Sequence, residues 1–281
     1  MIHIITDSTS DLSAEQAKAL GVEVMPLMVH FGGECYLDGV EITKEAFYEK
    51  LSSAETLPTT SQINPDAFVQ RFQAYVDAGD TVVGIFLSSK MSGTCQSAMI
   101  ARNMVDPDRV FVVDSNTVTF ALGLLVTEAA ALRDQGKTAA EIAREMEELS
   151  GRVRLVAMVD TLKYLKMGGR ISAATAAMGG LLGINPMIAI EESGIVESAG
   201  KVRGKKAAFR WISEYLERVP VDPAYRVSFG HSNAPAVMEE CIEALSGKVD
   251  TARAIRSGIG AVVGTHAGPG AAGIAYIRSF S

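Results

Sequence analysis

The sequence predicts an α/β protein whose first half folds around a parallel, doubly wound sheet and whose second half has α+β character. Three short segments rich in β-branched and other apolar residues, at 2–6, 82–87 and 110–113, predict buried strands. A polar turn follows each of them, and helices are then expected near 15–20, at 94–104 and up to about residue 133. This alternation is typical of a parallel sheet, because each strand needs a crossover before the next one.

The pattern changes after residue 151. Strands expected at 186–190 and 195–198 flank the turn 191–194 and predict a β-hairpin. Local antiparallel pairing indicates a second domain, so we expect domains at 1–150 and 151–281. The other elements expected here are strands at 155–159 and 225–229, helices at 161–166, from 172, at 205–218 and at 235–245, and a terminal strand pair.

The composition argues against several function classes. The net charge of −7 is unsuited to general nucleic-acid binding, although five basic residues fall within ten positions: Lys201, Arg203, Lys205, Lys206 and Arg210. The three cysteines and four histidines are scattered without zinc-binding spacing. We therefore expect no metal, no nucleic acid, no signal peptide, no stable membrane insertion and a cytoplasmic location.

The segment 88–94, Ser-Ser-Lys-Met-Ser-Gly-Thr, is a candidate anion site. It follows a predicted strand, and ligands of open α/β sheets bind beyond the carboxyl ends of the strands. Ser92 or Thr94 is expected to cap the next helix, whose positive end favours an anion, and Gly93 lets a ligand approach the backbone. A plain helix cap is the alternative interpretation.

Two further hydroxyl clusters are candidates. Thr59, Thr60 and Ser61 precede Asn64, the natural cap of a helix that starts with proline, so these hydroxyls have no local structural task. A solvated loop is the alternative. The turn 7–11, Asp-Ser-Thr-Ser-Asp, is compatible with a metal or phosphate site, but an Asx turn with a capping side chain is the favoured interpretation.

The segment 268–273 has the glycine spacing of a dinucleotide-binding loop, but the helix, strand and acidic residue that this fingerprint requires do not follow. We expect these glycines to let a strand pass close to a ligand or to another backbone. His266, just before them, is either a donor to a bound anion or a structural histidine. A Ser92–His266–Asp114 triad stays open without specific support.

The segment 167–190 mixes glycine and alanine with methionine, leucine and isoleucine. Small residues permit close packing of helices, and methionine fills irregular space. Domain–domain packing and the wall of an apolar tunnel are both compatible with this composition.

Seven motifs occur in order along the chain: ITDSTSD at 5–11, TTSQ at 59–62, SSKMSGT at 88–94, VVDS at 112–115, TLKYLKMGGRI at 161–171, KVRGKKA at 201–207 and THAGPG at 265–270. Together they resemble the DegV family of bacterial fatty-acid-binding proteins. Each motif alone is weak, and their common order over the full length makes the resemblance specific. One departure is Ile63, where the family usually has proline.

The resemblance implies an N-terminal Rossmann-like domain and a C-terminal α/β domain, with a long-chain fatty acid between them. Thr60 and Ser92 match positions that hydrogen-bond the carboxylate. Ser61 and the Gly93 N–H are further candidates, and His266 matches a histidine near the head group.

Some members of the family present the fatty acid to a separate kinase, which phosphorylates the carboxylate for phospholipid synthesis. Arg203 matches a basic position for contact with that kinase. We therefore expect a carrier that binds lipid, has no cofactor and is not itself an enzyme. The alternatives are a Ser/His-dependent enzyme acting on an acyl or phosphorylated molecule, and a lipid-sensing protein without a kinase.

Overall fold

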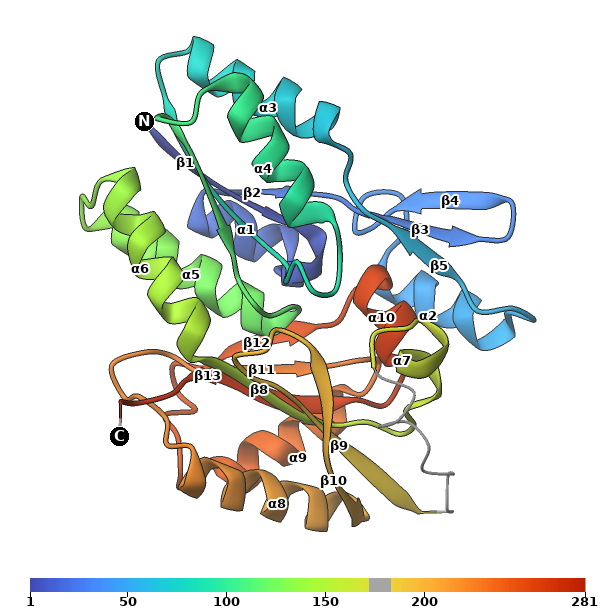
Figure 1. Cartoon of the computed structure of the whole chain (residues 1–281). Helices are drawn as coiled ribbons and strands as arrows, with labels where there is room; N and C mark the ends of the chain where they lie inside the picture. Colours follow the sequence, from blue (N-terminus) through green and yellow to red (C-terminus); the bar gives the residue numbers. More distant parts are fainter. Residues whose placement is uncertain (172–182, 281) are drawn as a thin grey trace.

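The computed structural model describes residues 1–171 and 183–280. The first half of the chain forms a parallel sheet, the second half forms a mixed sheet, and helix α5 (Phe120–Asp134) packs between the two (Figure 1). The predicted fold class, a parallel α/β part followed by a mixed-sheet part, is confirmed.

The parallel sheet has the strand order β2 (Val22–Met25), β1 (Ile2–Asp7), β6 (Thr81–Phe86), β7 (Val110–Asp114). Its two faces are covered by α3 (Pro65–Asp77) with α4 (Thr94–Val105) and by α5 with α6 (Ala139–Arg152). Alternate residues of a strand point to opposite faces, so Val82 packs with α3 and α4 whereas Val83 packs with α5 and α6. Burial of both faces explains the continuous apolar runs of these strands.

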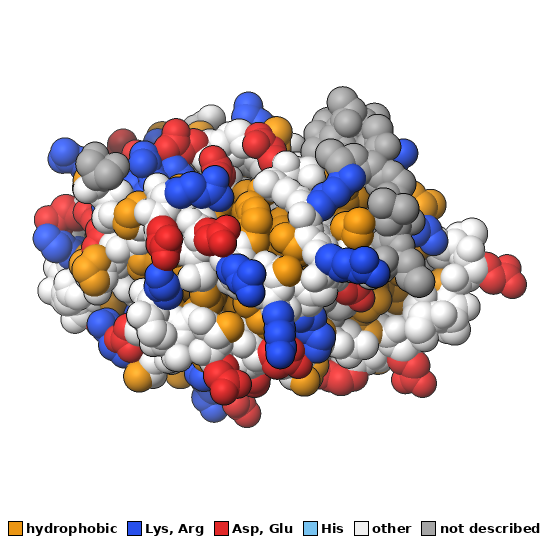
Figure 2. Space-filling view, turned by 90° about the horizontal axis from the view of Figure 1, so that it is seen from below, with side chains coloured by type: hydrophobic (Ala, Val, Ile, Leu, Met, Phe, Trp, Pro, Cys, Tyr) orange, Lys and Arg blue, Asp and Glu red, His pale blue; other side chains and the backbone are white. Residues whose placement is uncertain are grey.

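The mixed sheet has the order β10 (Val196–Arg203), β9 (Ile184–Ile190), β8 (Val153–Met158), β13 (Ala272–Ile277), β11 (Ser228–His231), β12 (Ile255–Gly258). Only β11 and β12 are parallel neighbours. Its outer face is covered by α8 (Lys205–Arg218) and α9 (Pro235–Leu245). On the surface below these helices, basic and acidic side chains are interspersed (Figure 2), and Lys205 Nζ lies 2.9 Å from Glu240.

Helix α5 shows how the two halves are joined. Ten of its fifteen residues are buried, because one side faces the parallel sheet and the other faces the mixed sheet. A helix that is apolar all round must be buried on every side. The strand β8, the first of the mixed sheet, begins at Val153, directly after α6. A domain division at residues 150/151 stays a prediction.

Several small elements complete the fold. Residues 28–61 add an antiparallel sheet of β3 (Met28–Phe31), β4 (Glu34–Leu37) and β5 (Thr59–Ser61), and helix α2 (Lys44–Ser53). The remaining short helices are η1 (Ser8–Ser10), α1 (Ala14–Leu20), α7 (Lys163–Met167) and α10 (Ala261–Ala267). Although α10 belongs to the second half by sequence, it packs against α2, β3 and β5 of the first half (Figure 1).

The structure corrects three expectations. Thr59–Ser61 is a strand paired with β3 and not a solvated loop, so its backbone does have a structural task. The strand expected at 225–229 begins at Ser228. The last two strands are not a pair, because β11 lies between β12 and β13 and α10 separates them along the chain.

The hairpin of β9 and β10 and the close passage of the C-terminal glycines are confirmed. A Cβ on Gly273 would lie 2.2 Å from the Val156 carbonyl oxygen of the neighbouring strand. The helix expected from residue 172 lies outside the described residues. Among the described helices, none is both long and apolar enough to cross a bilayer.

Candidate functional site

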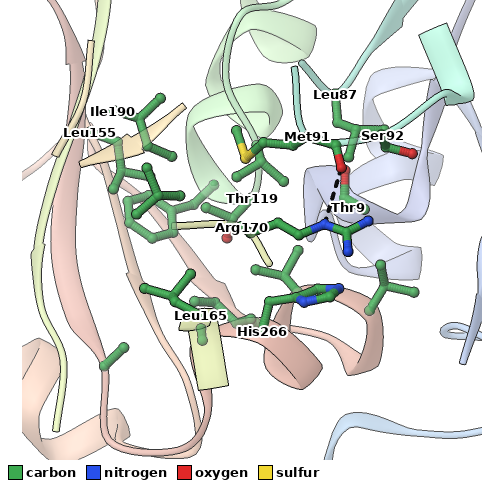
Figure 3. A pocket seen from close by; sticks show the side chains of 18 of the residues that line it. Thr9, Leu87, Met91, Ser92, Thr119, Leu155, Leu165, Arg170, Ile190 and His266 are labelled. Atoms are coloured by element: carbon green, nitrogen blue, oxygen red, sulfur yellow. Dashed lines mark hydrogen bonds between the residues drawn. The ribbon is translucent and has the colours of Figure 1, made fainter. Parts of the chain in front are cut away.

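A cavity of about 330 Å³ lies between the two halves of the molecule. Its volume is within the range of about 300–1,000 Å³ that is usual for small-molecule sites. Its wall is apolar at one end and polar at the other (Figure 3). A single ligand with an apolar body and a polar head would therefore match the wall along its length.

The apolar end is built mainly from the mixed sheet. Figure 3 shows Leu155 and Ile190 on the side of the cavity away from Ser92 and His266. The buried apolar residues that line this end come from β8, β9, β10 and the start of α5: Leu155, Ala157, Ile188, Ile190, Val196, Val118 and Phe120. These side chains offer no hydrogen-bonding group, so this end suits a hydrocarbon chain.

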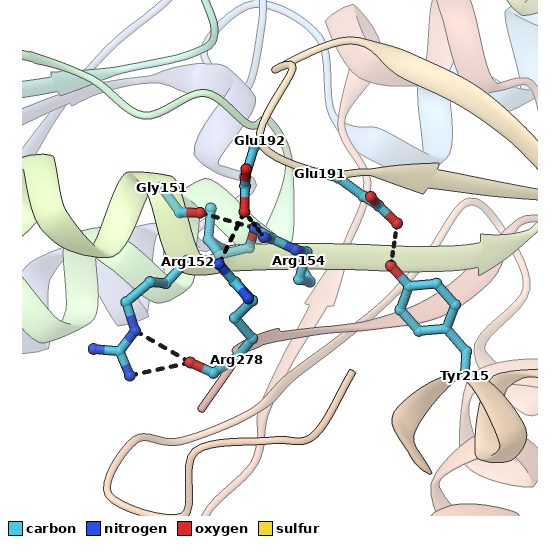
Figure 4. A network of polar contacts seen from close by, with 8 residues as sticks. Gly151, Arg152, Arg154, Glu191, Glu192, Tyr215 and Arg278 are labelled. Atoms are coloured by element: carbon cyan, nitrogen blue, oxygen red, sulfur yellow. Dashed lines mark hydrogen bonds and ion pairs between the residues drawn. The ribbon is translucent and has the colours of Figure 1, made fainter. Parts of the chain in front are cut away.

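The turn between β9 and β10 connects two residues that line the apolar end, Ile190 and Val196. The Ser88 hydroxyl, fully buried, donates to the Gly194 carbonyl oxygen at 2.6 Å and fixes the turn to the first half of the molecule. On the other side of the turn, Glu192 accepts hydrogen bonds from Arg154 at 2.6 Å and from Arg278 at 3.0 Å, and Tyr215 donates to Glu191 (Figure 4).

The polar end brings together side chains from four separate segments. Thr60 comes from β5, Ser92 from the turn before α4, Arg170 from the segment after α7, and His266 from α10. The Thr60 hydroxyl lies 3.0 Å from His266 Nε2. All five predicted carboxylate ligands, Thr60, Ser61, Ser92, Gly93 and His266, line this one cavity. Their role as ligands stays a prediction.

His266 is held as a neutral imidazole. Burial, and secondarily the positive charge of Arg170, lowers the pKa of His266 to about 4. Its Nδ1 has no hydrogen-bond partner among the described residues and faces Gly168, where a Cβ would lie 2.2 Å from that nitrogen. A buried N–H without a partner is rarer than a buried acceptor without one, so we assign the hydrogen to Nε2. His266 then donates to Thr60, whose own hydroxyl hydrogen stays available to a ligand.

The start of α4 supplies hydroxyl and backbone groups. The N-cap residue is Gly93, so neither Ser92 nor Thr94 occupies the expected cap position, although the Ser92 hydroxyl accepts from the Thr94 N–H at 3.3 Å. Ser92 Oγ lies 3.0 Å from Thr94 Oγ1. A Cβ on Gly93 would lie 2.1 Å from the Gln62 side-chain oxygen, so a larger residue here would displace the end of the Gln62 side chain.

The other hydroxyls of β5 differ from Thr60. Ser61 lines the cavity, but its hydroxyl already lies 2.9 Å from His30 Nε2. Thr59 is exposed and does not line the cavity. Thr59 and Thr60 differ because neighbouring residues of a strand point to opposite sides.

Arg170 is a candidate that sequence reasoning missed. Its Nε donates to the Met91 carbonyl oxygen at 3.2 Å and its Nη1 donates to the Gly168 carbonyl oxygen at 2.6 Å, which holds the guanidinium at the polar end of the cavity (Figure 3). The available signal was its position in the motif at 161–171. A cation at this place favours an anionic head group.

The residues of the possible triad do not assemble. The Asp114 carboxylate accepts hydrogen bonds from the backbone N–H groups of Ser89 and Asn116. Ser92 contacts Thr94, and His266 contacts Thr60. No hydrogen bond among the described residues joins the three members of the Ser92–His266–Asp114 triad.

The turn 7–11 has a structural role. The buried Asp7 carboxylate caps η1 by accepting from Thr9 N–H at 2.9 Å, and it also accepts from Leu87 N–H at 2.9 Å. Burial raises the pKa of Asp7 to about 6. No group of metal-ligating side chains occurs in the described part of the chain. The Asx-turn interpretation is thus supported.

Arg203 lies apart from this cavity. It ends β10, opposite Ile184 of β9, and its side chain is exposed. It does not line the cavity. A contact between Arg203 and a partner protein stays a prediction.

Comparisons with known proteins agree with the fold. Residues 1–279 match the family model described as "Uncharacterised protein, DegV family". A DegV domain-containing protein of Caldanaerobacter subterraneus is 40% identical over 98% of each chain. Two solved structures are similar over nearly the full length of both chains. One is a fatty-acid-binding DegV family protein from Thermus thermophilus, with 34% identity and a TM-score of 0.87 over 98% of this chain and 99% of that one. The other is a stearic-acid-binding protein from Eubacterium ventriosum, with 29% identity and a TM-score of 0.86 over 99% of this chain and 98% of that one. The chain belongs to the DegV family.

Proposed function

We propose that this protein binds a long-chain fatty acid, with the carboxylate at the polar end of the cavity and the acyl chain at the apolar end. The observation that carries the proposal is the division of one cavity into a wall of hydroxyl, imidazole and guanidinium groups and a wall of buried hydrocarbon. Fatty acid binding by the similar structures from Thermus thermophilus and Eubacterium ventriosum supports it.

The polar end satisfies the requirements of a buried carboxylate. Such a group is costly to bury unless donors surround it. Thr60 and Ser92 each offer a hydroxyl, Gly93 offers a backbone N–H, and Arg170 offers a positive charge. His266 acts through Thr60, because it occupies the Thr60 oxygen from the other side.

The apolar end accounts for most of the affinity. Each CH₂ group that leaves water contributes about 0.8 kcal/mol. A long acyl chain therefore contributes more than the hydrogen bonds of the head group, each of which is worth about 1.5–3 kcal/mol when one partner is charged. The head group fixes the orientation of the ligand in the cavity.

We further propose that the protein presents the bound carboxylate to a fatty acid kinase. The residues at the polar end, among them Ser92, Arg170 and His266, are partly exposed, whereas those at the apolar end are buried. The carboxylate is thus the part of the ligand nearest to a partner. Arg203 is the proposed contact for that partner, and the chemical step belongs to the kinase. The three free thiols suit a reducing, cytoplasmic location.

The binding proposal is tested with purified protein. Native mass spectrometry should show a co-purified long-chain fatty acid. After removal of lipid, Thr60→Ala and Ser92→Ala should each weaken stearate affinity by roughly tenfold to a hundredfold, as expected for a lost hydrogen bond to a charged group. Thr59→Ala is the matched control, because Thr59 is the exposed neighbour on the same strand. Unchanged affinity in the Thr60→Ala, Ser92→Ala double variant would contradict the head-group assignment.

The kinase proposal needs a separate measurement. Arg203→Ala should slow acyl phosphate formation by an added fatty acid kinase and leave stearate affinity unchanged, because Arg203 does not line the cavity. Arg210→Ala, an exposed arginine on α8, is the control. Equal rates for both variants and the wild type would rule out the proposed contact.

A further inference from the structure

A buried charged cluster joins the two halves of the molecule beside the cavity. The first half contributes Asp11, Asp38 and Lys44, and the second half contributes the backbone of 258–262 at the start of α10. Asp11 is 2% exposed and Asp38 is 5% exposed. We call these three side chains the α10 clamp.

Asp11 bridges the starts of two helices that line the cavity. One carboxylate oxygen accepts from Gly260 N–H at 2.7 Å, before α10, and the other accepts from the Thr119 hydroxyl at 2.5 Å, before α5. Thr119 has φ 59° and ψ −145°, a region that β-branched residues rarely adopt. Asp11 therefore holds a strained residue of the cavity wall in place.

Asp38 holds the first turn of α10. Its two carboxylate oxygens accept from Ala261 N–H at 2.9 Å and from Val262 N–H at 3.4 Å. A Cβ on Gly260 would lie 3.1 Å from both Asp11 and Asp38, so the backbone passes between the two carboxylates. Isolated helices as short as α10 are unstable in water, and external contacts must fix its position.

Lys44 completes the clamp. Its ammonium group donates to the carbonyl oxygens of Asp11 and Gly258, one in each half. Burial raises the pKa of Asp11 and of Asp38 above the usual value, although Lys44 acts against this rise. Burying two carboxyl groups lowers stability relative to apolar residues of similar size. Their presence here therefore indicates a role beyond packing.

Helix α10 also borders the cavity. Val262 and Val263 line the cavity wall, and His266 lies one turn further along and contacts Thr60. A shift of α10 by a fraction of an ångström would change the distance between His266 and Thr60. The clamp thus acts on the head group without touching it.

We propose that Asp11 and Asp38 are positioning residues for fatty acid binding, which fix the start of α10 from the first half and thereby hold His266 against Thr60. This inference rests on the proposed function. It predicts that the clamp affects both ligand affinity and the environment of the His266 ring, whereas a purely structural role would affect thermal stability alone.

The experiment compares Asp38→Ala and Asp38→Asn with the wild type and with Glu128→Gln. Asparagine keeps an acceptor for one of the two N–H groups and should rescue part of the loss. Glu128 is a matched control, because it is a partly buried carboxylate on α5 that faces Arg226 of the second half and does not touch α10. Stearate affinity is measured after removal of lipid, and the ¹⁵N shifts of His266, assigned by their loss in His266→Ala, are recorded in the free protein.

We expect Asp38→Ala to weaken stearate affinity about tenfold, the loss that corresponds to a helix cap of about 1.4 kcal/mol, and to move the His266 signals. Asp38→Asn should lie between this variant and the wild type, and it replaces Asp38→Ala if the latter does not fold. If the His266 signals of Asp38→Ala do not move, the inference is overturned, whether or not stearate affinity falls. If they move but stearate affinity is unchanged, the inference is overturned as well. A wild type that binds no stearate would instead overturn the proposed function, which is a distinct result.

Discussion

At the scale of single residues, the polar end depends on the direction of one hydrogen bond. His266 donates to Thr60 because it is neutral and has its hydrogen on Nε2. A protonated ring would also place a hydrogen on Nδ1, where no described residue accepts it. Neutrality of His266 is therefore part of the site, and it leaves Arg170 as the positive charge for the carboxylate.

The protonation of His266 can be measured directly. Its pKa is lowered to about 4, so its ¹⁵N signals should stay those of a neutral ring from pH 8 down to about pH 5 in an NMR titration. Between about pH 4 and 6.5 the unfolded chain binds this proton and the folded state does not, so the His266 contribution lowers stability as pH falls through that window. A transition of His266 near pH 6.5, the value of a solvent-accessible histidine, would contradict the assignment.

Gly168 offers a steric test of the same ring. Its φ is −75°, which any residue adopts, so Gly168→Ala adds only a methyl group that would lie 2.2 Å from His266 Nδ1. We expect the ring to move away from Thr60 and stearate affinity to fall by about tenfold, as for the loss of about 1.4 kcal/mol. Gly151→Ala in α6 is the control, because nothing lies within 4 Å of its added Cβ. Equal affinities for the two variants would show that the ring is not confined by Gly168.

At the scale of elements, the long segments were predictable and the short ones were not. The strands β1, β6 and β7 and helices α4 and α8 follow from local hydrophobic patterns, because each buries its own apolar face. Helix α10 has seven residues and owes its place to Asp11 and Asp38, which lie more than 220 positions earlier. A pattern read from neighbouring residues therefore cannot reveal α10 together with the two carboxylates that hold it.

The clamp between these elements should give stability a pH dependence. Burial raises the pKa of Asp11 to about 7, with Lys44 and Asp38 as its charged neighbours. Between about pH 4 and 7 the folded state keeps the proton that the unfolded chain has released, so the free energy of unfolding falls as pH rises, by up to about 1.4 kcal/mol per pH unit. Asp11→Asn should flatten this slope in urea unfolding, and asparagine also tolerates the positive φ of 54° at this position. The exposed Glu15→Gln is the control, and an unchanged slope in Asp11→Asn would contradict the shift.

At the scale of the whole molecule, the site exists only because the two halves meet. Thr60, Ser92 and His266 come from β5, the start of α4 and α10, and the apolar end comes from the mixed sheet. Residue patterns alone indicated separate candidates at 59–61, at 88–94 and at His266, and the ordered motifs joined Thr60, Ser92 and His266 around one carboxylate. Neither predicted Arg170 or the clamp, because both depend on contacts between distant segments.

A ligand that spans both halves should stabilise the molecule as one unit. Stearate at about 100 times its dissociation constant should add about 2.7 kcal/mol to the free energy of unfolding. For a chain of this length, that corresponds to a rise in Tm of roughly 5 °C over the lipid-free protein, measurable by calorimetry. The Thr60→Ala, Ser92→Ala double variant should rise less at the same stearate concentration, because its weaker head-group contacts lower the occupancy. A ligand that bridges Leu155 of the mixed sheet and Ser92 of the first half must oppose the unfolding of both halves. If the two halves unfold in separate transitions and stearate raises the Tm of only one, the ligand binds within that half.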